Sequence, residues 1–186
     1  RGDMGVEVPM EEVPVLQKKM IKLANAQGKH VITATQMLES MIKNPRPTRA
    51  EATDIANAIH DGTTAIMLSG ETAAGQYPVQ AVQTMARIAE CAEQDIDYHS
   101  RMVKVAMSEK ESITAAIAYA TCSTAMDLKV AAIITVTMSG YTAASISRYK
   151  PGCPIIGCTV NNKVARQLNL LWGVTPLYLE KAECTE

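Results

Sequence analysis

Residues 30–37, His-Val-Ile-Thr-Ala-Thr-Gln-Met, and residues 64–69, Thr-Ala-Ile-Met-Leu-Ser, are the clearest indication of the fold class. Each stretch is short, apolar and rich in β-branched residues, which is typical of a buried strand. Between them, Thr48-Arg-Ala-Glu51 has the pattern of a capping box, and the helix that it opens ends at Gly62. A strand, a loop, a helix and a second strand in this order indicate parallel βα units.

The same alternation continues on both sides of this core stretch. The sequence predicts helices before and after it, and a polar segment at residues 97–112 that marks a domain boundary. A second set of alternating elements follows. The predicted helices cover residues 11–27, 78–96, 112–128, a short stretch up to 149, and 162–171, and the later strands cover 130–137, 154–160 and 174–179. The pattern therefore predicts an α/β protein in two parts, and leaves open whether the first is an open sheet or a barrel.

Composition limits the function classes. The 186 residues carry a net charge of −1, which argues against a nucleic-acid-binding protein. No segment approaches the roughly 20 apolar residues that cross a bilayer, so no membrane partner is expected. The five cysteines, Cys184 among them, form an odd set without a CxxC pair, so neither a zinc site nor a disulfide framework fits. A cytoplasmic protein is expected, with a core built without Phe and with many of the 11 Met residues.

Polar residues gather where the two strands end. Thr35 and Gln36 close the first strand, and Ser69 and Glu71 follow the second. Asp3 would occupy an equivalent place if the chain begins just after a strand. Carboxylate and hydroxyl groups at this edge could hold a hard cation and an anionic substrate. The alternative is that the hydroxyls only satisfy nearby backbone groups and that Glu71 is solvated.

A second candidate site lies in the later part of the chain. Residues 137–142, Thr-Met-Ser-Gly-Tyr-Thr, join a strand to the start of a helix. Hydroxyls and free backbone N–H groups at such a junction can bind a phosphate, and a simple capped turn explains the same residues equally well. The possible phosphate ligands are Thr137, Ser139, Gly140 and Thr142.

Four motifs in this order resemble pyruvate kinases. They are Arg-Gly-Asp-Met-Gly-Val-Glu (1–7), Ala-Thr-Gln-Met-Leu-Glu-Ser-Met (34–41), Pro-Arg-Pro-Thr-Arg-Ala-Glu (45–51) and Met-Leu-Ser-Gly-Glu-Thr-Ala (67–73). The resemblance implies that residues 1–97 are the last βα units, a quarter, of a (β/α)8 TIM barrel. Residues 98–186 would then be the first part of a three-layer α/β C-terminal domain.

The resemblance also implies an activity. The family transfers a phosphoryl group from phosphoenolpyruvate to ADP, giving pyruvate and ATP in glycolysis, with Mg2+ (or Mn2+) and usually K+. It implies a cytoplasmic, allosteric homotetramer. By motif, Asp3 matches a Mg2+ ligand, and the N–H groups of Gly2 and Asp3 match those that bind the substrate carboxylate. Thr35 matches the threonine beside the reacting carbon, and Ser69 a serine that helps relay a proton to the enolate.

Other parts of the family's active site, including its catalytic lysine, a second acidic Mg2+ ligand and the K+ ligands, would lie before Arg1. The chain is therefore expected to supply part of an active site and to be inactive alone. Tyr141 stands where the family often has an arginine after the Thr-x-Ser-Gly turn of residues 137–140, which weakens the case for a sugar-phosphate effector there. Two rival functions are a non-catalytic regulatory or assembly module that binds a phosphometabolite, and an adhesion ligand that uses Arg1-Gly2-Asp3. The lack of a signal pattern disfavours the latter.

Overall fold

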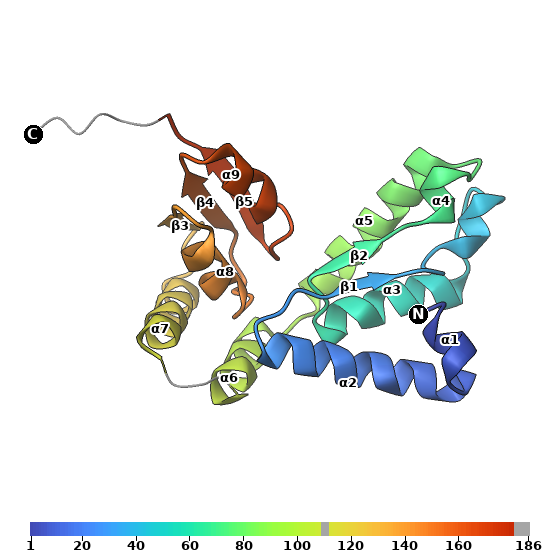
Figure 1. Cartoon of the computed structure of the whole chain (residues 1–186), viewed down its shortest axis with the longest axis horizontal. Coiled ribbons are helices and arrows are strands. Elements are labelled where there is room, and N and C mark those ends of the chain that lie inside the picture. The colour runs from blue at the N-terminus through green and yellow to red at the C-terminus, as the bar shows by residue number, and fades with distance from the viewer. Residues whose placement is uncertain (109–111, 181–186) are drawn as a thin grey trace, which may run out of the picture. The chain divides into compact units, whose positions relative to one another are not determined.

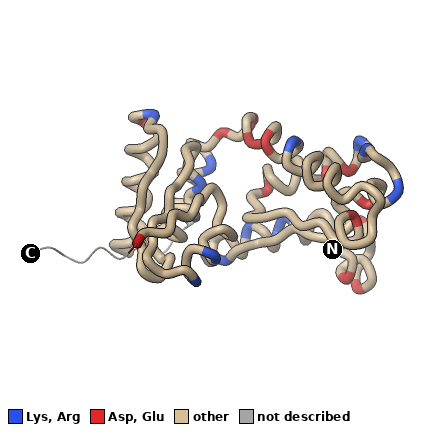
Figure 2. Tube along the Cα trace, turned by 90° about the horizontal axis from the view of Figure 1, so that it is seen from above, with Lys and Arg blue, Asp and Glu red and all other residues tan. Residues whose placement is uncertain are grey.

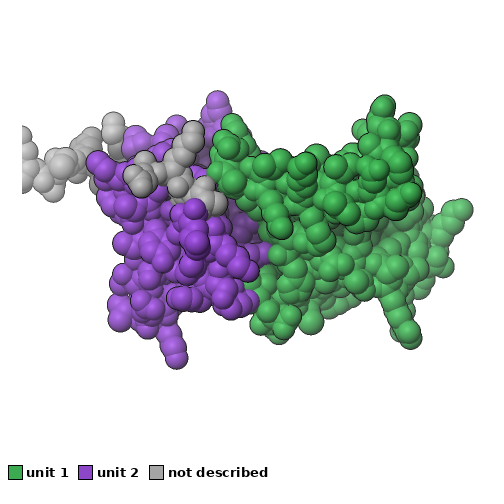
Figure 3. All heavy atoms as spheres, turned by 90° about the horizontal axis from the view of Figure 1, so that it is seen from below, with its two compact units in different colours: residues 1–96 green, residues 97–186 purple. Residues whose placement is uncertain are grey.

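The computed structural model describes residues 1–108 and 112–180, in two compact units formed by residues 1–96 and 97–186 (Figures 1 and 3). Residues 109–111 of the predicted polar segment, and Cys184, lie outside the described residues. Lys and Arg are interspersed with Asp and Glu along the trace, in keeping with the net charge of −1 (Figure 2). In the part of the chain that is described, no helix is long and apolar enough to cross a membrane.

The first unit contains two parallel strands and the helices that follow them (Figure 1). Strands β1 (Ile32–Ala34) and β2 (Ala65–Met67) pair in a register that aligns Ala34 with Met67. The remaining elements are α1 (Met4–Glu7), η1 (Met10–Glu12), α2 (Val13–Ala26), η2 (Glu39–Ile42), α3 (Arg49–Asp61), α4 (Gly70–Ala73) and α5 (Pro78–Gln94). The parallel βα arrangement predicted from residues 30–69 is confirmed.

Strand β1 is shorter than predicted because its last expected residues leave the extended region. Thr35 has φ 68° and Gln36 has φ 53°, both left-handed. A left-handed backbone is unusual for any residue but glycine and most unusual for a β-branched one such as Thr35. The chain therefore turns sharply at the carboxyl end of β1.

The capping box predicted at the start of α3 is present. The Thr48 hydroxyl accepts the Glu51 N–H at 3.2 Å, and the Glu51 carboxylate accepts the Thr48 N–H at 2.7 Å. At the other end, Gly62 has φ 94°, a left-handed cap that a side chain would strain. These two ends fix the length of α3.

Helices α3 and α5 pack against each other and over the sheet residues of the first unit. Three methionines are buried in this core, so the expectation of a Met-rich core without Phe is confirmed. The buried residues are Met37, Leu38, Met41, Ile55, Ala58, Ala81 and Met85. Thr33 on β1 is also buried, and its hydroxyl is 2.9 Å from the Thr63 hydroxyl.

The second unit begins with a helix that was not predicted. Residues Tyr98–Ser108 form α6, inside the segment that the sequence analysis took as a polar linker. The Asp97 carboxylate accepts the Ser100 N–H at 3.0 Å and starts the helix, and Met102 is fully buried in the core of this unit. Val105 and Ala106 pack against the same core, so apolar residues placed between polar ones anchor this helix.

A three-stranded parallel sheet forms the centre of the second unit, in the order β3-β4-β5 (Figure 1). A side chain at Gly157 on β4 would touch Ala143 of α8 and Leu168 of α9, so both helices lie on one face of the sheet. Helix α7 packs against α8. The elements are α7 (Ile113–Asp127), β3 (Ile133–Val136), α8 (Tyr141–Ser147), β4 (Ile155–Thr159), α9 (Asn162–Leu168) and β5 (Val174–Tyr178).

Candidate active site

The carboxyl ends of β1 and β2 bring two predicted site residues to one edge of the sheet. Ala34 pairs with Met67, so Thr35 follows β1 at the same edge at which Ser69 follows β2. Both residues are partly buried. In α/β folds, ligands bind at this edge, where the loops begin.

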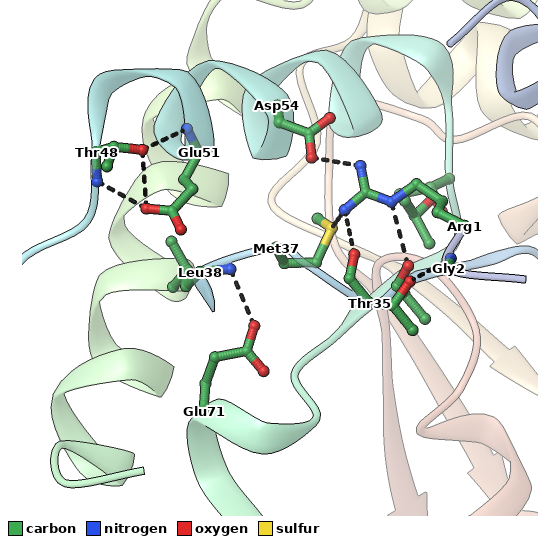
Figure 4. A network of polar contacts seen from close by, with 12 residues as sticks. Arg1, Gly2, Thr35, Met37, Leu38, Thr48, Glu51, Asp54 and Glu71 are labelled. Carbon is green, nitrogen blue, oxygen red and sulfur yellow. Dashed lines mark hydrogen bonds and ion pairs between the residues drawn. The ribbon is translucent and has the colours of Figure 1, made fainter. Parts of the chain in front are cut away.

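The N-terminal segment joins the same edge (Figure 4). The N–H of Gly2 donates a hydrogen bond of 3.0 Å to the Thr35 hydroxyl. The neighbouring Asp3 is exposed. The structure thus brings Gly2 and Thr35 into contact and leaves the Asp3 carboxylate accessible beside them.

Arg1 attaches this segment to β1 and α3 (Figure 4). Its guanidinium donates to the carbonyl oxygens of Ala34 at 3.2 Å and of Thr35 at 2.5 Å, and it lies 2.6 Å from the Met37 sulfur. It also forms an ion pair with Asp54 of α3. The Arg1 side chain is 13% exposed, so these contacts are largely removed from solvent. Sequence reasoning singled out neither Arg1 nor Asp54 for this role.

Glu71 occupies a position that contradicts the interpretation of a solvated side chain. It is 1% exposed, and its two carboxylate oxygens accept N–H groups from two different loops, of which Figure 4 shows the bond to Leu38. Oε1 accepts the Leu38 N–H at 3.0 Å, and Oε2 accepts the Ser69 N–H at 2.8 Å. One side chain therefore joins the loop after β1 to the loop after β2.

The surroundings of Glu71 keep it ionised. Burial raises the pKa of its carboxyl group, but hydrogen bonds from backbone N–H groups, those of Leu38 and Ser69 among them, outweigh burial and bring the pKa below its usual 4.5. The nearby Glu51 carboxylate opposes this with a smaller effect. Because N–H donors favour the charged form, this buried carboxylate can stay ionised although the partners in both bonds, the Leu38 and Ser69 amides, are neutral.

The Glu51 carboxylate of α3 forms a second set of hydrogen bonds to the segment that follows β1. Besides closing the capping box, it accepts the Ser40 N–H at 2.7 Å and the Ser40 hydroxyl at 2.6 Å. Burial raises the pKa of Glu51, but the hydrogen bonds from Ser40 and Thr48 outweigh it and the net pKa is lowered. The end of the β1 loop is therefore attached to the first turn of α3.

The donor chemistry of this edge suits a hard divalent cation only in part. The Asp3 carboxylate is the kind of oxygen ligand that Mg2+ prefers. Within the described residues, however, no group of three or more His, Cys, Asp or Glu side chains is arranged to hold a metal ion. A Mg2+ ion at Asp3 would take its remaining ligands from substrate, water or protein outside these residues.

The loop at residues 137–142 lies in the second unit, between β3 and α8. Two of its backbone N–H groups already have partners: Thr137 Oγ1 accepts the Gly140 N–H at 2.9 Å, and Ser139 Oγ accepts the Tyr141 N–H at 3.4 Å. Thr137 is buried, whereas Ser139 and Thr142 are exposed. A capped turn with Gly140 at φ 87° accounts for this geometry.

Comparison with known proteins identifies relatives for both units. The family described as pyruvate kinase, barrel domain, matches residues 1–82, and the one described as pyruvate kinase, alpha/beta domain, matches residues 115–186. A pyruvate kinase from Clostridium acetobutylicum is 54% identical over 186 residues, which are 100% of this chain and 39% of the relative. One from Bacillus licheniformis is 58% identical over 174 residues, 94% of this chain and 30% of the relative.

A solved structure gives the same result. The crystal structure of a pyruvate kinase from Cryptosporidium parvum superposes with a TM-score of 0.94 at 47% identity, covering 96% of this chain and 36% of that one. The present chain thus spans less than two fifths of the length of each of these three proteins.

Proposed function

This chain belongs to the pyruvate kinase family, and from that premise we propose that it contributes part of an active site for phosphoryl transfer from phosphoenolpyruvate to ADP. The observation that carries the proposal is the meeting of Gly2 and Thr35, with Asp3 exposed beside them, at the strand edge where such folds bind ligands. The family supports these substrates, and the geometry supports the location at which an anion and a metal ion would bind.

In the proposed reaction a terminal phosphate oxygen of ADP attacks the phosphorus of phosphoenolpyruvate, and the bond from phosphorus to the enol oxygen breaks. The products are ATP and the enolate of pyruvate, which becomes pyruvate when carbon 3 gains a proton. We assign the N–H groups of Gly2 and Asp3 to the substrate carboxylate, because backbone donors suit an anion; the Gly2 N–H would exchange its bond to the Thr35 hydroxyl for one to the substrate. The Thr35 hydroxyl positions the substrate or passes a proton through water, since its own pKa is too high for a lone base. Ser69 is assigned to the same proton relay.

The family generally uses Mg2+ and K+. Asp3 is the residue in this chain that we propose as a ligand of Mg2+, or of Mn2+ in its place. A divalent ion bound there would supply positive charge against the anionic substrate and the charge that develops during transfer. K+ is proposed for the complete enzyme on the family resemblance alone.

We further propose a cytoplasmic homotetramer as the working form, with allosteric control. These assignments rest on the family. The boundary between its two domains is proposed at residues 97 and 98, and the division of the structure after Ile96 supports it.

The rival function, a non-catalytic module that binds a phosphometabolite at residues 137–142, has less support. The amides of Gly140 and Tyr141, which would face a phosphate, already bond to hydroxyls of their own loop. An effector phosphate at Thr137, Ser139, Gly140 and Thr142 would have to replace these bonds.

A full-length chimaera tests the proposed function. In it, this chain replaces the matching 39% of the Clostridium acetobutylicum relative. We expect turnover of phosphoenolpyruvate and ADP to pyruvate and ATP, with Mg2+ and K+ present, within about tenfold of the parent enzyme. A chimaera that folds and assembles like the parent but produces no pyruvate would contradict the assignment.

A further inference from the structure

The two loops that carry Thr35 and Ser69 are joined through one buried side chain. Within the described residues 1–108, no backbone hydrogen bond joins residues 35–38 to residues 69–71, whereas the Glu71 carboxylate bonds to one N–H in each stretch. One donor is Leu38, three residues after Thr35 (Figure 4), and the other is Ser69 itself.

Both ends of this connection are tightly held. Leu38 is fully buried, and Glu71 is 1% exposed at the start of α4. Gly75 closes the turn behind α4, where a Cβ atom would lie 2.4 Å from the Glu71 carbonyl oxygen. The close packing of Gly75 on Glu71 leaves no room for a side chain there, and the buried Glu71 carboxylate is held by its bonds to the Leu38 and Ser69 amides.

We propose that Glu71 is a positioning residue, which sets the separation of Thr35 and Ser69 by holding the Leu38 and Ser69 amides on one carboxylate. The proposal rests on the proposed function for its consequences in catalysis, but not for the geometry itself. A buried carboxylate that accepts two N–H groups has its oxygens engaged and oriented, which suits support of the site and not the transfer of a proton.

The structure also distinguishes this role from general stabilisation. Replacement by glutamine keeps the size of Glu71 but replaces one acceptor oxygen with an NH2 group, so one of the two amides loses its partner. Thr35 and Ser69 would then no longer be fixed relative to each other. Misplacement of about 1 Å in an active site can cost about 100-fold in rate.

The test uses Glu71→Gln in the full-length chimaera, with Glu90→Gln as the matched control because Glu90 is exposed on α5. Three quantities are measured: kcat for phosphoryl transfer, exchange of the pyruvate methyl protons with D2O, and hydrogen exchange of the Leu38 and Ser69 amides. For Glu71→Gln we expect the first two rates to fall together by about 100-fold and at least one of the two amides to exchange about tenfold faster or more. Glu90→Gln should match the parent in all three.

Two results would overturn the proposal. One is unchanged amide exchange at both Leu38 and Ser69. The other is loss of methyl-proton exchange with phosphoryl transfer intact, which would make Glu71 a proton carrier.

If Glu71→Gln does not fold, Glu71→Asp provides the test, because its side chain is one methylene shorter and its carboxylate cannot keep both bonds. We expect it to lower kcat about tenfold and to release one amide, and parental values in both would contradict the proposal. Amide exchange can be measured even if the chimaera is inactive. A failure of the proposed function can therefore be distinguished from a failure of the positioning proposal.

Discussion

The Arg1 guanidinium donates a 2.5 Å hydrogen bond to the backbone carbonyl of Thr35, whose hydroxyl accepts the N–H of Gly2 at 3.0 Å. Two adjacent residues of the N-terminal segment therefore hold both the backbone and the side chain of one threonine. Asp54 fixes the guanidinium from the α3 side. The left-handed conformation of Thr35 is stabilised by contacts and not by its own preference.

Removal of the Asp54 charge should disturb the site more than the fold. In the chimaera, we expect Asp54→Asn to lower kcat about fivefold, the equivalent of about 1 kcal/mol, because Arg1 loses its ion pair but keeps its carbonyl acceptors. The exposed Asp95, at the end of α5, provides the control Asp95→Asn. Steady-state kinetics of the two variants decide, and equal rates for both would remove Asp54 from this role.

Two substitutions of Thr35 distinguish the contribution of its hydroxyl group from that of its side-chain shape. Thr35→Val keeps the β-branched form and deletes the contact to the Gly2 N–H, and we expect kcat to fall about 100-fold with a smaller change in KM for phosphoenolpyruvate. Thr35→Ser retains the hydroxyl and should stay within a few-fold of the parent. A valine variant with parental kcat would mean that the hydroxyl takes no part in the reaction.

Asp3 is expected to act through the metal ion. Asp3→Ala should lower kcat about 1000-fold or more, about 4 kcal/mol, and raise the Mg2+ concentration needed for half-maximal rate. Glu7→Ala removes another exposed carboxylate from the same segment and serves as the comparison. A titration of rate against Mg2+ measures both effects, and the assignment fails if the two variants need the same concentration.

Lys150 should make the stability of the chain depend on pH. Its side chain is buried, and burial, with a smaller contribution from the Arg101 charge, lowers its pKa from 10.5 to about 7. Between these two values the unfolded chain binds the proton and the folded chain does not, so the free energy of unfolding rises with pH in this window. Below about pH 7 the lysine is charged in both states and the dependence disappears.

Lys150→Met should therefore remove a slope of up to about 1.4 kcal/mol per pH unit between about pH 7 and pH 10. The control is Lys129→Met, since Lys129 is exposed and has nearly the same left-handed backbone, φ 50° against 47°. Urea unfolding of the three proteins across this range gives the comparison. If the difference in unfolding free energy between the parent and Lys150→Met does not change with pH, Lys150 does not titrate as described.

The sequence predicted what depends on local pattern. The capping box at Thr48 and Glu51, the glycine cap of α3 and the parallel βα order follow from residue type and spacing, and the structure confirms them. The four motifs identified the family, and the matches to both domain families confirm it.

What escaped prediction depends on contacts between distant residues. The bonds from Glu71 to Leu38 and from Arg1 to Asp54 span 33 and 53 positions, and no local pattern encodes them. The left-handed Thr35 was read as the end of a strand because its β-branched side chain favours extended backbone. The one available signal was that Glu71 stands among apolar and small residues, where a solvated carboxylate is less expected.

The left-handed pair Thr35–Gln36 has a consequence for protein engineering. At both positions a glycine would relieve about 1 kcal/mol of backbone strain. Gln36 is exposed, so selection for thermostable variants could accept Gln36→Gly without harm to turnover. The same selection applied at Thr35 would favour proteins that are harder to melt and slower to react. At Gln36, selection for heat resistance would leave turnover unchanged. At Thr35, the same selection would lower turnover.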